Sequence, residues 1–181
     1  MNWRVESFPD MQDYIPRDSI LPLKLHQPSH GDRVSFLETS IGNAALHIVM
    51  QMRHAASEDD SRRGRHSSRI WEPCIQVLQS TLKLVVEEHL DEEGCEVTYG
   101  RAGLLYALLL LRAELLSHNT SDEHLTLVEA VNSVTSDEAI ASLVEDIIKR
   151  GEIGAKNYAD TLSSEESKRA PPLMWGWQGR R

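Results

Sequence analysis

Two cysteines and eight histidines are the residues of this sequence best suited to hold a metal ion. Zinc takes about four nitrogen or sulfur ligands in tetrahedral geometry, which short spacings such as Cys-x-x-Cys supply. Cys74 and Cys95 are instead 21 positions apart, and Pro28 between His26 and His30 prevents the helix that would align those two histidines. The sequence therefore predicts no metal site in this chain, and Cys74 is interpreted as a core residue.

Two further groups could perform acid–base chemistry. His47 and His54 are seven residues apart and share one face of a helix. Paired carboxylates can hydrolyse glycosides, and five of them gather in one segment: Glu87, Glu88, Asp91, Glu92 and Glu93. Charged runs at a helix end and histidines at a helix rim are usually solvated. We therefore favour a solvated surface for both groups and predict no catalytic residue.

Arg101 is the strongest candidate for a binding residue. It follows Gly100 at the start of an apolar helix, where the helix N-terminus and a guanidinium together attract a carboxylate or a phosphate. Arg101 and the nearby Tyr99 are therefore the candidate substrate-binding residues. The alternative, which we favour slightly, is a salt bridge from Arg101 that clamps neighbouring loops. Three glycines are interpreted as structural turn residues that permit close helix packing: Gly42, Gly100 and Gly103.

Helices are the elements expected to position these residues. Apolar residues repeat at three and four positions in the first, second and last helix, and no segment shows a convincing strand pattern. The helix from 101 to 117 is apolar nearly all round, so it is expected in the interior, covered on all sides. The predicted fold class is all-α, with helices beginning near Ser40 and spanning about 70–90, 101–117, 122–132 and 136–159.

The chain divides into three regions by composition. Residues 1–33 contain four prolines and are expected to form an extended, Pro-rich arm. Residues 34–160 form the helical-hairpin region, interrupted by a charged, small-residue loop at 57–68 that is expected to be mobile. Residues 161–181 form a polar tail and a Trp-rich terminal segment, whose tryptophans have no following structure to pack against.

Composition excludes several classes of function. The formal net charge is −9, which argues against a protein that grips a nucleic-acid backbone. The longest apolar stretch covers ten residues, 102–111, whereas a membrane span needs about 20. The first residues lack the pattern of a secretory signal, and two free cysteines suit a reducing cytosol. A cytoplasmic protein with no membrane span is expected.

Three segments resemble motifs of the lanthionine synthetase C-like proteins. Residues 99–109, YGRAGLLYALL, resemble the family's YGRxGxLYALL motif. Residues 35–42, SFLETSIG, resemble its FLxGDxG turn, with Ser40 in place of the aspartate, and residues 171–177, PPLMWGW, resemble its PLMxxW segment. The order and spacing agree over about residues 34–181, and the likeness is strongest to the fungal branch.

The resemblance implies an (α/α) toroid of six helical hairpins. It also implies a peptide-modifying activity in the full-length family, in which zinc held by two Cys and one His activates a thiol, for example a glutathione-like one, for addition to a dehydrated Ser or Thr. The zinc ligands belong to the C-terminal half, which this chain lacks. The expectation is therefore the N-terminal part of a barrel, with no zinc of its own and inactive alone.

A non-catalytic helical protein-interaction module is the alternative function. Too few amphipathic helices remain to cover the apolar residues 104–111 completely. Exposed apolar surface of this kind drives association. We therefore expect self-association through exposed apolar helices unless a partner is supplied.

Overall fold

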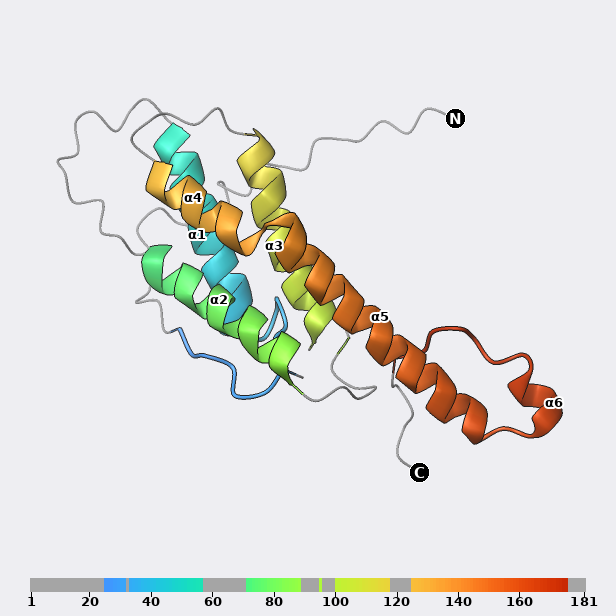
Figure 1. The fold of residues 1–181 in the computed structure, drawn as a ribbon. Helices are drawn as coiled ribbons and strands as arrows, with labels where there is room; N and C mark the ends of the chain where they lie inside the picture. The colour runs from blue at the N-terminus through green and yellow to red at the C-terminus, as the bar shows by residue number, and fades with distance from the viewer. Residues whose placement is uncertain are drawn as a thin grey trace.

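A computed structural model of the chain describes residues 25–31, 33–56, 71–88, 95, 100–117 and 125–175. The regular elements within these ranges are all helices, with no strand (Figure 1), which confirms the predicted all-α fold class. The helices are α1 (Ser40–Ala56), α2 (Trp71–Glu87), α3 (Arg101–Ser117), α4 (Leu125–Val134), α5 (Asp137–Asp160) and α6 (Ser164–Ser167). No helix in the described part of the chain is both long enough and apolar enough to span a membrane.

The helix boundaries agree closely with the sequence pattern. α1 begins at Ser40 and α3 has the predicted bounds, whereas α2 ends three residues early and α4 begins three residues late. Ser136 caps α5 as predicted, because its Oγ accepts a hydrogen bond from the Ala139 N–H at 3.2 Å. α6 was not predicted, since four residues are too short to show a helical period. The loop at 57–68 and most of the Pro-rich arm lie outside the described residues.

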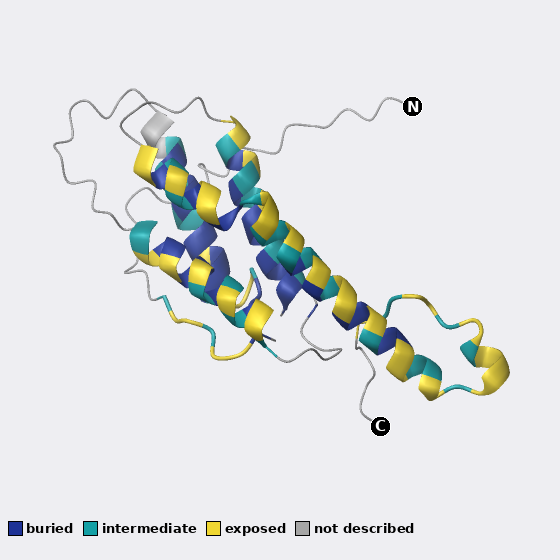
Figure 2. Ribbon diagram, in the orientation of Figure 1, coloured by how far each residue is buried: buried dark blue, intermediate teal, exposed yellow. Residues whose placement is uncertain are grey.

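The apolar core lies where α1 meets α2 and α3 (Figure 2). α1 contributes the face predicted from its apolar residues, which recur every three or four positions. α2 and α3 supply the apolar side chains opposite this face. The core side chains that are fully inaccessible to solvent include Ile41, Ala44, Ala45, Ile48, Leu78, Leu104, Leu108 and Leu111. This packing joins the first three helices into one bundle, to which α4 and α5 add.

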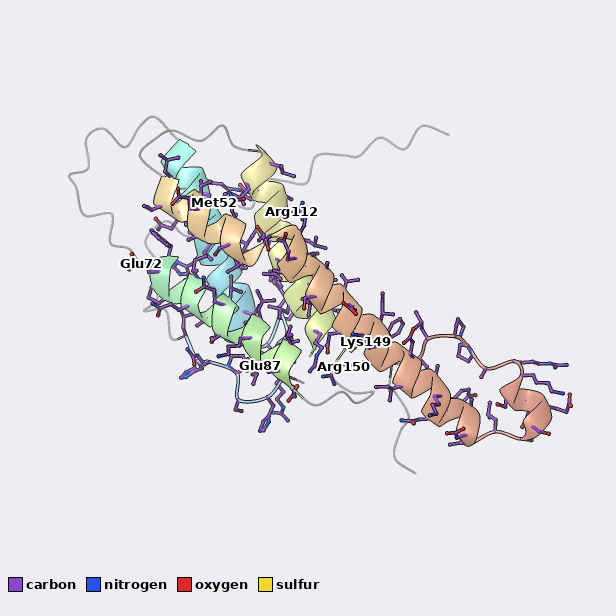
Figure 3. All side chains as sticks on the ribbon, viewed as in Figure 1. Met52, Glu72, Glu87, Arg112, Lys149 and Arg150 are labelled. Carbon is purple, nitrogen blue, oxygen red and sulfur yellow. The ribbon has the colours of Figure 1, made fainter. Side chains whose placement is uncertain are left out.

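α3 and α5 run antiparallel to each other. At one end of their contact Arg101 of α3 lies 2.8 Å from Asp146 of α5. At the other end Arg112 of α3 lies 2.6 Å from Asp137 of α5, and Figure 3 labels Arg112 near that end. α5 then continues beyond the bundle (Figure 1), and the chain folds back through α6 toward the middle of α5.

One face of α3 is open to solvent, so the expectation that this helix is covered on all sides is wrong. Tyr106 is 53% exposed, Leu109 46% and Leu116 83%. These residues are separated by three and then seven positions and share one face, whereas α1, α4 and α5 pack elsewhere on the helix. The uncovered face agrees with the expectation that too few helices are present to enclose α3.

The expectation that the terminal tryptophans find nothing to pack against is also wrong for Trp175. Its indole Nε1–H donates a hydrogen bond to the Ile147 carbonyl oxygen of α5 at 2.8 Å. The two residues are 28 positions apart, and the chain reverses direction between them. Sequence periodicity reveals contacts within one helix or strand, so it could not reveal this one.

Candidate functional site

Arg101 is buried at the centre of a group of charged and polar partners contributed by four parts of the chain. It is the first residue of α3, and its side chain is 1% exposed. Its Nη2 donates to Oε2 of Glu88, just past the end of α2, at 2.6 Å. Its Nη1 donates to the Gly31 carbonyl oxygen at 3.1 Å, and its Nε lies 2.8 Å from Oδ2 of Asp146 on α5. The guanidinium thus connects α2, α3, α5 and the segment before α1.

The contact between Arg101 Nε and Asp146 is an ion pair rather than a directed hydrogen bond. The distance is short, but the Nε–H is not aimed at an acceptor within hydrogen-bond geometry. Asp146 also accepts a hydrogen bond from Nε of Arg150, one turn later on α5, at 3.0 Å. Both side chains of this second pair are at most 8% exposed. One carboxylate therefore serves two arginines.

Opposite charges pair within this group. Among the described residues, Arg101 faces the carboxylates of Glu88 and Asp146, and Arg150 faces Asp146. Pairing of this kind offsets the cost of removing charged groups from water, whereas removal of one partner leaves a charge less well compensated. Each charged side chain of the group therefore depends on its partners to remain stable in this position.

Gly31 completes the group from the segment before α1. Its N–H donates to Oε1 of Glu88 at 3.1 Å, while its carbonyl accepts from Arg101. A Cβ atom at this position would collide with Oε2 of Glu88 and would lie 2.8 Å from Nη2 of Arg101. A larger residue here would therefore have to displace the ends of the Glu88 and Arg101 side chains. Sequence reasoning missed Gly31, because an isolated glycine in a loop carries no periodic signal.

This geometry fills the space around Arg101 with the chain's own groups. The salt bridge that we weighed as the structural alternative is present, and it joins neighbouring segments as that interpretation requires. Binding of a substrate by Arg101 stays a prediction. Tyr99, the second candidate, lies outside the described residues. Gly100 accepts a hydrogen bond from the Gly103 N–H at 2.9 Å, in the first turn of α3.

Gly42 also has a close backbone neighbour. A Cβ atom at Gly42 would collide with the carbonyl oxygen of Phe36, in the turn that leads into α1. Contact with backbone atoms leaves little room for adjustment. The position therefore suits the structural role predicted for it.

A second ion pair joins α1 to α3. Nε and Nη2 of Arg53 donate to the two carboxylate oxygens of Glu114 at 2.6 and 3.0 Å. The Glu114 side chain is 8% exposed, and two parallel hydrogen bonds give the pair a fixed geometry. The register of α1 against α3 is thus set by this pair as well as by apolar packing.

The cysteines and histidines do not gather in the described part of the chain. Cys74 and Cys95 are buried and form no disulfide, and burial raises the pKa of the Cys74 thiol to about 11, which keeps it protonated at neutral pH. Burial lowers the pKa of His47, while the side chain of His54 lies outside the described residues. No group of three or more His, Cys, Asp or Glu residues that could hold a metal is found among the described residues.

The acidic segment 87–93 divides into different environments. Glu87 is exposed and lies 3.9 Å from Lys83, as expected for a solvated face. Glu88 is turned inward to Arg101, so the solvated interpretation is wrong for this residue. Glu88 directly follows the last residue of α2, and its N–H still donates to the Leu84 carbonyl oxygen at 3.0 Å. The other three carboxylates lie outside the described residues.

We expect the purified chain to retain no stoichiometric zinc. A structural or catalytic zinc site needs three or four nitrogen or sulfur ligands held together, and the thiol of Cys74 would have to ionise against its raised pKa. Elemental analysis after dialysis measures the metal directly. Stoichiometric zinc that survives dialysis would contradict this expectation.

The open face of α3 is the second candidate site, and we call it the α3 face: Tyr106, Leu109, Ala113 and Leu116. Between residues 102 and 116, each α3 position that is not buried is apolar except Arg112, which pairs with Asp137. Leu37, 71% exposed, follows Phe36, whose ring packs edge-on against Tyr106 with centroids 4.9 Å apart. The face therefore extends beyond α3 at the Tyr106 end.

The other end of the α3 face opens into a shallow depression. Leu116 lines it together with Arg112 and Asn132, and its volume is about 340 Å³. The depression lies where α3 meets the turn between α4 and α5. Apolar surface and an adjoining hollow together suit the packing of another helix or loop against α3.

No protein-family model, curated protein or solved structure matches this chain. The likeness to the lanthionine synthetase C-like proteins therefore rests on the three sequence motifs alone.

Proposed function

We propose that this chain is a non-catalytic helical interaction module that associates through the α3 face. The observation that carries the proposal is the exposure of Tyr106, Leu109 and Leu116 on one side of the most apolar helix. A helix that faces water permanently places polar residues on that side. Contiguous apolar surface on a folded protein marks a site of contact with another molecule.

The charges favour a second copy as the occupant when the chain is alone. A net charge of −9 makes two copies repel each other over most of their surfaces. The α3 face has no exposed carboxylate, because the one acid of α3, Glu114, is buried against Arg53. A two-fold pairing of the α3 faces would bury leucines and tyrosines, and the Arg112–Asp137 pair beside the face carries one charge of each sign.

A second proposal rests on the motif at 99–109. We propose that the chain is the N-terminal part of a lanthionine synthetase C-like protein, inactive alone, in which the α3 face would pack against another hairpin of an (α/α) toroid. Zinc, the thiol and the peptide substrate would then depend on the zinc-binding half. A coding sequence that continues in frame into Cys and Cys-His motifs favours this proposal, and a true stop codon favours the interaction module.

Two lysines on the α3 face test the association. We expect Leu109→Lys/Leu116→Lys to sediment as a monomer at concentrations where the unaltered chain forms larger species, because burying the new ammonium groups would be costly. Sedimentation velocity measures this. The matched control is Val86→Lys on α2, which replaces an apolar residue that is 49% exposed and lies outside the α3 face. Equal association of the double variant and the unaltered chain would contradict the proposed interface.

A further inference from the structure

The distal half of α5, residues 151–160, contributes nothing to the apolar core of the described residues. α5 has 24 residues and is about 36 Å long. No residue of α5 beyond Ile147 belongs to the apolar core, and Figure 1 shows the helix continuing past the other elements. Gly151 and Gly154 weaken a helix interior, and an isolated helix of ten residues is marginal in water. Another part of the chain must stabilise this segment.

The segment 173–175 supplies contacts at the start of that half. The Met174 N–H donates to the Gly151 carbonyl oxygen at 2.8 Å, and the Trp175 indole Nε1–H donates to the Ile147 carbonyl oxygen at 2.8 Å. One backbone donor and one side-chain donor thus reach carbonyls one turn apart on α5. The two contacts fix both the path and the orientation of the returning chain.

Gly151 provides the room for the indole ring. A Cβ atom on Gly151 would lie 2.7 Å from Cε2 and 2.8 Å from Nε1 of Trp175, which is too close for either atom to remain in place. Gly151, Gly154 and Ala155 are all buried, although they lie outside the core. Gly151 therefore forms a seat on α5, and Trp175 occupies it while 39% of its own surface stays exposed.

We propose that residues 173–175 are a latch that holds the distal half of α5 folded, and that this latch opens without unfolding the bundle. Both hydrogen bonds of the latch go to α5, and the core lies on the other helices and the proximal half of α5. Local opening is expected where few apolar contacts join a segment to the core. Opening would expose the seat around Gly151 to solvent.

Hydrogen exchange of the full chain tests the latch. We expect Trp175→Ala to speed exchange of the amides of residues 152–160 by about tenfold or more, with no change at α3. Trp175→Phe keeps an aromatic ring but lacks the indole N–H, so we expect a smaller increase. In two-dimensional NMR spectra, the Trp175 indole proton of the unaltered chain should exchange more slowly than that of a solvent-exposed tryptophan.

Gly151→Ala gives the sharpest test, because the latch reverses the usual effect of this substitution on hydrogen exchange. Replacing glycine by alanine inside a helix ordinarily stabilises it and slows exchange. Here the added Cβ displaces Trp175, so we expect faster exchange at 152–160. Lys156→Ala is the matched control, an exposed position in the same half-helix where alanine should leave exchange unchanged or slower.

Three results would overturn the latch. They are slower exchange in Gly151→Ala, unchanged exchange at 152–160 in Trp175→Ala, and an equal rise at α3 and distal α5. The last result would mean that the segment stabilises the whole fold and does not act on α5 alone.

Discussion

Leu108→Asp is expected to abolish folding, whereas Leu109→Asp, one residue along α3, is expected to leave the chain folded. Leu108 is 0% exposed, so an aspartate there would be a buried charge with no counterion. That costs several kcal/mol, against a total stability of about 5–15 kcal/mol for a typical domain. Leu109 is 46% exposed on the α3 face, where a carboxylate can remain hydrated.

Far-ultraviolet circular dichroism and thermal melting distinguish these two variants. We expect Leu108→Asp to lose the cooperative transition and most of the soluble helical signal, and Leu109→Asp to melt within a few degrees of the unaltered chain. From the sequence alone both leucines appeared equally buried. A folded Leu108→Asp, or an unfolded Leu109→Asp, would mean that the buried side of α3 is assigned wrongly.

Arg101→Ala is expected to destabilise the fold by about 3–5 kcal/mol, because it removes the guanidinium that Glu88 and Asp146 share and leaves Asp146 with Arg150 alone. Urea denaturation followed by circular dichroism measures the loss. The matched control is Arg112→Ala on the same helix. Arg112 pairs with Asp137, which is 82% exposed, so its loss is expected to cost about 1 kcal/mol or less.

The comparison of these two arginine variants decides what Arg101 does. A large loss of stability for Arg101→Ala alone identifies a structural clamp. A loss no greater than that of Arg112→Ala would contradict the clamp and favour a role in binding, since a buried guanidinium would then contribute little to the fold. The quantity to compare between the two variants is therefore the urea concentration at which half of the protein is unfolded.

The helices themselves could be predicted because their signals are local. The repeat at Ile41, Ala44 and Ile48 set the buried face of α1, and Ser136 marked the start of α5. α3 was predicted to the residue, but its orientation was not. A helix that is apolar all round has no polar side to indicate which face meets solvent, so Leu108 and Leu109 could not be distinguished.

The candidate sites depend on contacts between distant segments, which composition and period do not encode. Glu88 and Asp146 reach Arg101 from different helices, and Gly31 reaches it from 70 positions away. The seat of Trp175 on Gly151 likewise needs the chain to reverse after α5. Such contacts arise from tertiary packing. The sequence could offer Arg101 as a candidate but could not identify its partners.

The most direct test of the interaction module is the sedimentation behaviour of the unaltered chain from low to high micromolar concentration, with a hydrophobic dye added in parallel. We expect the weight-average mass to rise above the 20.5 kDa of one chain as concentration increases, with dye binding that falls as the α3 faces associate. A single species of 20.5 kDa at every concentration, with little dye bound, would contradict the proposal. The helices would then be closed on themselves.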